Sequence, residues 1–186
     1  METTAWAIFY HRLIWGSVAA FFLLYLAACN GLKPSNEPLP GSESVTVERI
    51  EVGERSLLPG GEMHFAVYGD GDSFRAAYAR IHAGTLPKPA APAVDHTRWL
   101  VVGAFLGQRP TANHGIELGP AWTAADSSGT YLEMKVRETK PPAGSLAAQV
   151  VTSPYALVKI PREQWGRVRF VGPEGRLLAE VPVRDP

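Results

Sequence analysis

Short apolar segments separated by glycine and proline run along the chain from Val45 onward, a pattern typical of strands joined by turns. Apolar residues alternate with other side chains in Met63–Tyr68 and Leu132–Arg137, which predicts strands with one buried face. Trp99–Leu106 is almost continuously apolar, which predicts a central strand covered on both faces. Further strands are expected at Tyr155–Ile160, Arg167–Val171 and Leu177–Val183. The pattern therefore predicts a mainly β domain over residues 45–186, resembling an antiparallel β-sandwich.

One segment has the spacing of a helix instead of a strand. Apolar residues recur about every three to four positions within Ser73–Ala83, which predicts one short helix. Asp72 or Ser73 is expected to cap its N-terminus, because a short polar side chain can accept hydrogen bonds from exposed backbone amides. Gly172-Pro173-Glu174-Gly175 separates the last two expected strands, so we also expect the domain to end in a hairpin.

The chain's one cysteine, Cys29, directly follows an apolar run and two alanines. The run, Leu13–Leu26, comes after His11 and Arg12, which is the order of charged, apolar and small residues in a secretory signal. The segment resembles the signal of bacterial lipoproteins, in which the cysteine is lipidated and the preceding peptide is removed. We therefore expect residues 1–28 to be a signal peptide and Cys29 to carry acyl chains such as palmitate. This implies a lipid-anchored protein of the bacterial cell envelope, in the outer membrane or facing the periplasm if the cell is Gram-negative.

Two other interpretations of this segment stay open. It could be a transmembrane helix, although Leu13–Ala28 is shorter than the roughly 18–20 apolar residues that span a bilayer unless the helix starts at Trp6. It could also be a cleaved signal without lipidation, in which Cys29 is coincidental. The sequence holds no second cysteine with which Cys29 could pair.

Residues 29–44 have the composition of a spacer. Prolines and glycines lie among polar residues there, and no apolar periodicity is present. Such a segment cannot bury enough apolar surface to offset the entropy lost on ordering. We therefore expect a disordered spacer that separates the membrane anchor from the β domain.

The charge balance excludes one class of partner. The 18 basic and 18 acidic residues give a formal net charge of zero, and acidic residues are interspersed among the C-terminal arginines. Binding to a phosphate backbone depends on clustered lysine and arginine. We therefore expect no nucleic-acid partner.

Motifs of catalysis are missing from the sequence. It contains no G-x-S-x-G nucleophile motif, no H-E-x-x-H zinc helix and no G-x-x-x-x-G-K-[ST] phosphate loop. His96 and His114 could flank a site with Asp126 or Ser127 if the fold brings them together, but no sequence partner orients either imidazole as a base. We therefore expect a protein that is not an enzyme and that has no cofactor.

A metal site is not expected either. Gly69-Asp70-Gly71-Asp72 resembles the start of a calcium loop, but the further spaced acids and the terminal glutamate of such a loop do not follow. A turn that leads into the N-terminus of the expected helix, where acidic side chains are favoured, accounts for this segment.

Two motifs stand out in the second half of the chain. The first is Gly107-Gln108-Arg109-Pro110-Thr111-Ala112-Asn113-His114-Gly115-Ile116, and the second is Thr152-Ser153-Pro154-Tyr155. Together with V-x-E-x-x-P-P at Val136–Pro142, they resemble the C-terminal domain of the protease-complex subunit PrcB family of bacterial lipoproteins, over about residues 94–162. The positions that match the family's motifs are Gly107, Pro110, Thr111, Ile116, Thr152, Pro154, Tyr155, Val158, Ile160 and Pro161.

The centre of the first motif departs from the family's pattern. Ala112-Asn113-His114 stands where the family commonly has Gly-Gly-Tyr. We expect either that Asn113 adopts the positive φ that glycine would supply or that the loop takes another shape. A contact that the family makes through the aromatic ring is in doubt here.

The resemblance implies a non-catalytic envelope lipoprotein that binds or stabilises another extracytoplasmic protein, with a protease complex as the partner. A direct role in that contact and a purely structural role, in which these residues set turns and Tyr155 closes the core, are both open. The candidate contact residues are Arg109, Pro110, Thr111, Asn113, His114, Pro154 and Tyr155.

A loop-based protease inhibitor is the alternative function. The Pro-Thr loop and the later Pro-aromatic loop resemble those of chagasin-like cysteine-protease inhibitors, which insert several loops of an immunoglobulin-like sandwich into an active site. This reading requires the loops at Thr111 and at Pro154, or at Pro141-Pro142, to emerge together at one end of the domain. An enzyme that uses His96 or His114 is the third hypothesis.

Overall fold

The computed structural model describes residues 42–58 and 61–184, which lie in the second of two units, Asn36–Pro186. The expected signal peptide, the expected lipidation site Cys29 and the expected spacer up to residue 41 lie outside the described residues. Among the described residues, no helix is long and apolar enough to cross a membrane.

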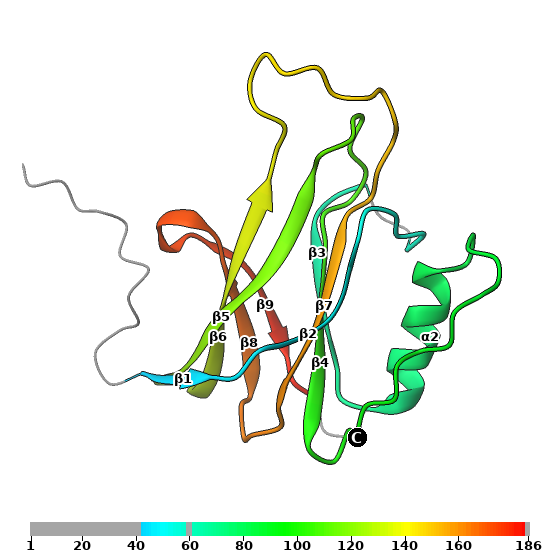
Figure 1. Ribbon diagram of the computed structural model, residues 1–186. Helices are drawn as coiled ribbons and strands as arrows, with labels where there is room; N and C mark the ends of the chain where they lie inside the picture. The colour runs from blue at the N-terminus through cyan, green and yellow to red at the C-terminus, as the bar shows by residue number, and fades with distance from the viewer. Residues whose placement is uncertain (1–41, 59–60, 185–186) are drawn as a thin grey trace, which may run out of the picture. The chain divides into compact units, whose positions relative to one another are not determined.

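Two β-sheets face each other, as the sequence predicted (Figure 1). The five-stranded sheet has the order β1 (Glu43–Val45), β5 (Gly115–Asp126), β6 (Gly129–Thr139), β8 (Arg167–Val171) and β9 (Leu177–Pro182). The four-stranded sheet has the order β2 (Glu48–Gly53), β7 (Tyr155–Pro161), β4 (Trp99–Phe105) and β3 (His64–Tyr68). Every neighbouring pair is antiparallel within the described residues except β6 and β8, which are parallel.

The main core lies between the sheets. Its fully buried residues come from both, for example Leu100 and Val102 on β4 and Leu132 and Met134 on β6. Removing such apolar side chains from water stabilises the fold by about 1.5–3 kcal/mol each. Sheet-on-sheet packing therefore accounts for the strand alternation in the sequence.

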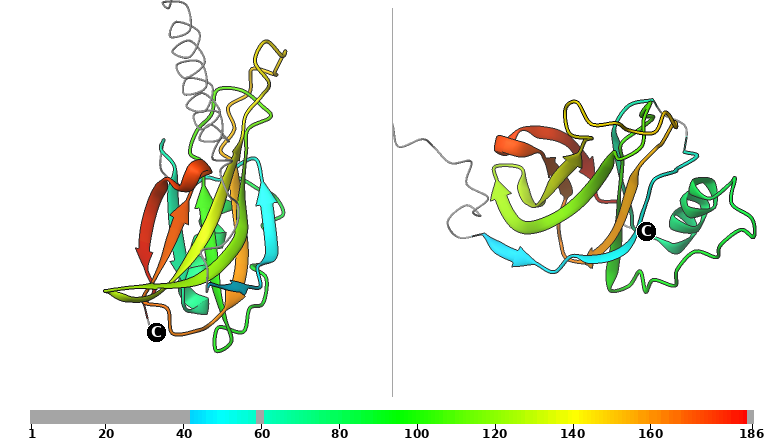
Figure 2. Two further views of the ribbon diagram at one scale, coloured as in Figure 1. Left: turned by 90° about the vertical axis from the view of Figure 1, so that its left-hand side faces the viewer. Right: turned by 45° about the horizontal axis from the view of Figure 1, so that its top comes forward.

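The prediction that Trp99–Leu106 is covered on both faces is confirmed. Leu100 and Val102 on β4 point into the core between the sheets, whereas Val101 and Phe105 belong to a second apolar cluster. Helix α2 (Gly71–Ile81) covers that second cluster, on the outer side of the four-stranded sheet (Figure 2). A strand between two apolar layers needs an apolar side chain at nearly every position.

Helix α2 is the expected helix, with a different cap. Asp70, and not Asp72 or Ser73, is the N-cap: its extended backbone lets the carboxylate accept a hydrogen bond of 2.7 Å from the amide of Ser73. The expected cap was wrong because the helix begins two residues earlier than the apolar spacing shows. Asp72 lies in the first turn, where the helix dipole favours an acidic side chain.

The first and last strands of the described domain can be compared with the β domain expected from the sequence. Strand β1 begins at Glu43, two residues before the expected start of the β domain, and pairs with β5 at Ala121–Thr123. Strands β8 and β9 form the predicted antiparallel hairpin, joined by a short 3-10 turn at Pro173–Gly175. Glycine suits that turn, since Gly175 has a φ of 77°.

Candidate functional site

The two motifs singled out in the sequence meet at one end of the sandwich. The segment 107–114 connects β4 to β5, and the segment 140–154 connects β6 to β7; both leave the sheets at the same end (Figures 1 and 2). The amide of Arg109 donates to the carbonyl of Thr152 over 2.8 Å, and the amide of Thr152 donates to the carbonyl of Arg109 over 2.9 Å. We call residues 107–114 and 140–153 the loop end.

A buried hydroxyl adds to this backbone pairing. Thr152 is only 6% exposed, and its hydroxyl donates to the carbonyl oxygen of Thr111 over 3.1 Å. Further along, the amide of Ala112 donates to the carbonyl of Ala148 over 3.0 Å. A buried hydroxyl without a partner would be costly, so this bond favours one relative placement of the two loops.

The third segment of the resemblance joins the same cluster. Glu138, near the end of β6, lies 3.7 Å from the guanidinium of Arg109 and 3.5 Å from the ammonium of Lys140. Arg109 also donates to the carbonyl of its neighbour Gln108. The glutamate of V-x-E-x-x-P-P is therefore the ionic partner of the first motif's arginine.

The backbone of the first motif needs two residues with positive φ. Gly107 has a φ of 77°, and a Cβ there would lie 2.5 Å from the carbonyl oxygen of Gly61. Asn113 has a φ of 67°, which confirms that asparagine supplies the conformation for which the family commonly uses glycine. Asparagine tolerates this region better than most other side chains.

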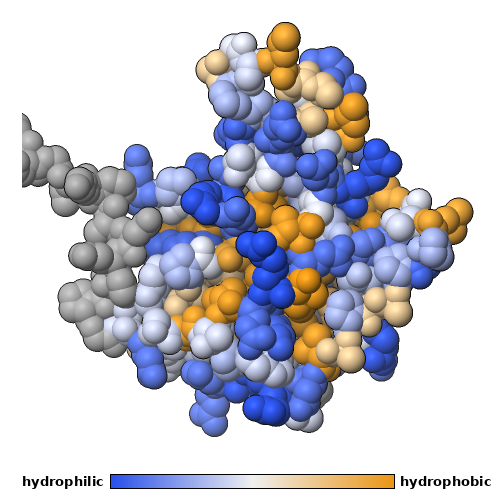
Figure 3. All heavy atoms as spheres, viewed as in Figure 1, coloured by the Kyte–Doolittle hydropathy of each residue, from blue (hydrophilic) through white to orange (hydrophobic). Residues whose placement is uncertain are grey.

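The longer loop exposes apolar side chains. Leu146 is fully exposed, and Val151 is 61% exposed, in a segment without helix or strand. Val150 is also exposed. Figure 3 shows apolar atoms at the top of the molecule, where Figure 1 draws this loop. A leucine and two valines are therefore exposed on one loop. Exposed apolar side chains that are covered together by a partner are a feature of interaction sites.

The comparison with protein families bears on these same loops. Residues 100–161 match the family model described as PrcB C-terminal. Over this segment the chain is similar to the PrcB C-terminal family. No curated protein and no solved structure matches the chain. The PrcB C-terminal segment runs from β4 through β7, so it contains the whole loop end and four of the strands that hold it.

The seven candidate contact residues of the PrcB C-terminal segment differ in their exposure. Pro110 and Asn113 are exposed, and Arg109, Thr111 and His114 are half-buried. Pro154 and Tyr155 are buried. These last two lie where β7 begins, and their burial favours the structural role for them over direct contact with a partner.

Tyr155 belongs to a polar cluster that sequence reasoning missed. Its hydroxyl donates to Glu51 of β2, and the same carboxylate lies 3.2 Å from Nε2 of His82, just after α2. The rings of Tyr78 and His82 lie 4.4 Å apart, and burial raises the pKa of Tyr78 to about 12. Gly53 leaves room for the ring, because a Cβ there would lie 2.5 Å from Tyr155. The cluster ties helix α2 to the sheet.

The histidines are not brought together with Asp126. Both ring nitrogens of His96 and Nδ1 of His114 are buried without a hydrogen-bond partner. Asp126 instead accepts from Arg167 over 2.6 Å, and chiefly these hydrogen bonds lower the pKa of its carboxyl to about 2. Desolvation lowers the pKa of His96, so its neutral form is favoured. The arrangement that an acid–base mechanism needs is not formed by these three residues.

The acidic and histidine side chains of the described residues are not arranged as a metal site. No group of three or more histidine, cysteine, aspartate or glutamate side chains there could hold a metal ion. Asp70 and Asp72, the acids of the expected turn at Gly69–Asp72, are engaged otherwise. Asp70 caps α2, and Asp72 pairs with Arg75.

Proposed function

We propose that this domain is a non-catalytic binding module that holds another protein through the loop end. The observation that carries the proposal is the exposure of Leu146, Val150 and Val151, on a loop attached to the family's own motifs. Apolar side chains that are exposed together lose their contact with water when a partner covers them, which is the main favourable contribution to most protein interfaces.

The hydrogen bonds between the two loops also favour binding, because they keep the loops ordered in the free protein. The Arg109–Thr152 bridge, the Thr152 hydroxyl and the bond from Ala112 to Ala148 hold the loops before any partner arrives. A loop that is already ordered loses less conformational entropy on binding than a flexible one. Pro110 also limits the backbone freedom of the shorter loop.

The partner that we propose is an extracytoplasmic protein of a protease complex. The description of the family suggests association with a protease, and the matched segment includes the loop end. We further propose that Cys29 is lipidated and anchors the protein in the cell envelope, which rests on the apolar run and the small residues before it.

A capture experiment tests the proposal. The full chain would be used to pull down proteins from detergent-solubilised envelope, beside the variants Leu146→Asp and Val151→Asp. We expect each variant to capture the partner about tenfold less well, since a charge in a covered apolar patch is poorly tolerated. Leu86→Asp is the matched control, because Leu86 is 92% exposed and lies outside the loop end. Equal capture by the loop-end variants and the control would refute the proposal.

Protease inhibition is the second candidate function, and one observation favours it. The Pro141-Pro142 loop and the loop of Thr111 emerge at the same end, which is the arrangement that an inhibitor of this kind requires. The test is an activity assay of a papain-like protease with increasing amounts of the full chain. Inhibition that is lost in Leu146→Asp would favour this function, whereas full protease activity at every concentration would exclude inhibition of this protease class.

A further inference from the structure

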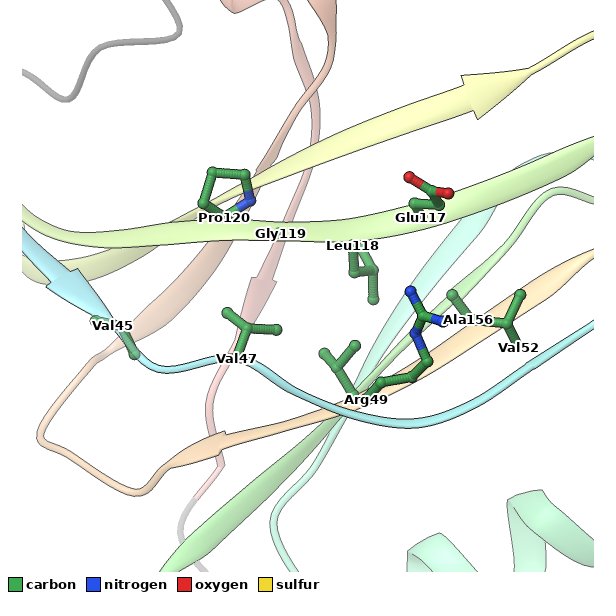
Figure 4. A pocket seen from close by; sticks show the side chains of 10 residues that line it. Val45, Val47, Arg49, Val52, Glu117, Leu118, Gly119, Pro120 and Ala156 are labelled. Carbon is green, nitrogen blue, oxygen red and sulfur yellow. The ribbon is translucent and has the colours of Figure 1, made fainter.

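A groove lies between the open edges of the two sheets, away from the loop end. It has a volume of about 350 Å³, and its walls come from the β1–β2 segment, from β5 and from β7 (Figure 4). The apolar lining consists of Val45, Val47, Val52, Leu118, Pro120, Ala156 and Val158. None of these residues belongs to the loop end, so the inference that follows does not rest on the proposed function.

Both strands that flank the groove have a free edge. Among the described residues, strand β2 is the last strand of its sheet and pairs with β7 alone. Strand β5 pairs with β6 along its length, but β1 covers its other edge only at Ala121–Thr123. The edge of β5 at Gly115–Leu118 therefore has no neighbouring strand within the described residues. Unpaired strand edges offer backbone donors and acceptors to an added strand.

The charges at the groove leave one cation without a counterion. Glu117 pairs with Arg137, and Glu48, at the start of β2, pairs with Lys159. The side chain of Arg49 forms no ion pair or hydrogen bond within the described residues, although its backbone pairs with Val158 of β7. Figure 4 shows Arg49 reaching from β2 toward β5, beside Leu118, which points from β5 into the same space. The groove therefore combines apolar walls with a guanidinium that suits a carboxylate.

The place where the open edge of β5 ends indicates what kind of carboxylate would bind at Arg49. A strand added along Gly115–Leu118 meets β1 at Ala121, just after the register shift of β5 between Leu118 and Ala121. An added strand cannot continue past that point along β5, and this favours the end of a chain over a segment from its middle. We infer that the groove binds the C-terminal end of an extended peptide, with its apolar side chains against Val47 and Leu118 and its terminal carboxylate at Arg49.

Fluorescence anisotropy with the full chain tests this site. The probe is a fluorescein-labelled peptide of sequence Gly-Thr-Val-Thr-Val with a free C-terminus, compared with the same peptide as its C-terminal amide. A third peptide, also an amide, carries glutamate at an internal position. We expect the free acid to bind about tenfold more tightly than either amide, as for a hydrogen-bonded charge pair.

Variants of the protein separate this site from others. Arg49→Gln should weaken binding of the free acid about tenfold and leave binding of the amide unchanged. Val52→Glu should weaken it as well, and Val52 is 47% exposed, so the substitution leaves the core intact. Arg176→Gln is the matched control, because Arg176 is exposed on the β8–β9 turn. Its affinity should equal that of the unchanged protein.

Several outcomes would overturn the inference. If the acid and amide peptides bind with equal affinity, or if Arg49→Gln does not change the affinity for the acid, the site does not recognise a terminal carboxylate. Tighter binding of the glutamate peptide than of the free acid would assign the groove to an internal acidic segment. No binding at about 1 mM peptide, the range of very weak complexes, would exclude a peptide. If laurate then binds in an Arg49-dependent way, the occupant is a fatty acid.

Discussion

The hydroxyl of Thr152 donates a hydrogen bond to the carbonyl oxygen of Thr111, which lies 41 residues earlier in the chain. This contact joins the two motifs that characterise the PrcB C-terminal segment, and it is buried. The threonine of T-x-P-Y therefore has a structural partner in the Pro-Thr loop. Thr152 and Thr111 therefore fix the position of the loop end for any partner that it binds.

Thr152→Val tests the contribution of this hydroxyl. Valine keeps the shape and the strand propensity of threonine but leaves the carbonyl of Thr111 without its partner. We expect the free energy of unfolding to fall by about 1–2 kcal/mol, measured by chemical denaturation. Thr130→Val is the control, because Thr130 is exposed on β6. A fall of the same size in both variants would show that the hydrogen bond contributes little.

Gly107→Ala tests the close approach of the first motif to Gly61. The substitution forces a side chain onto a backbone with a φ of 77° and brings its Cβ against the carbonyl of Gly61. We expect a loss of about 2–4 kcal/mol in the free energy of unfolding, from backbone strain and steric clash together. Gly129→Ala carries only the first of these effects, since Gly129 has a φ of 108° with open space around it. It should cost about 1–2 kcal/mol. Equal stability of the two variants would show that the close approach of Gly107 to Gly61 adds no steric cost.

The pH dependence of stability should reflect Asp126. Hydrogen bonds from Arg167 and the amide of Ser128 lower the pKa of this carboxyl from 3.8 to about 2 in the folded protein. Because the folded pKa is below the unfolded one, the stabilisation is complete above pH 3.8 and is lost as the pH falls toward 2. Asp126→Asn should therefore be less stable than the unchanged protein at neutral pH, and the two should converge near pH 2. Thermal unfolding at a series of pH values measures this difference, and a constant gap would contradict the assignment.

Cys29→Ser tests the expected lipid anchor. Serine lacks the thiol to which the acyl chain would be attached, so the variant should incorporate no fatty acid and should keep residues 1–28. Incorporation of radiolabelled palmitate into the two proteins measures this directly. Equal labelling of both proteins would refute the lipoprotein interpretation. Processing of the serine variant to the same length would indicate a cleaved signal without lipidation.

The site was only partly predictable. The sequence motifs located the loop of Pro110 and Asn113. A positive φ at Asn113 was one of the two alternatives that the missing glycine left open, and the structure has it. The exposure of Leu146 and Val151 was not predicted, because apolar residues in a segment rich in proline and glycine can be buried or exposed with equal ease. Tyr155 looked like a contact residue for a related reason: it is buried against residues of other elements and donates to Glu51, which lies 104 residues earlier.

By itself, the sequence determined the local elements of this protein. The two-residue alternation in Leu132–Arg137 and the helical spacing in Ser73–Ala83 each reflect which side of a single element is buried, and that information lies within a few neighbouring residues. The alternation in Met63–Tyr68 predicted a strand but not its burial, because β3 is half-buried along its whole length and packs on both apolar clusters. The tertiary structure alone decided which elements pair. Strand β2 was not singled out, since its bulge between Arg49 and Glu51 interrupts the alternation. The parallel pairing of β6 with β8 and the open edge of β5 beside Arg49 depend on contacts between distant parts of the chain, which no local pattern encodes.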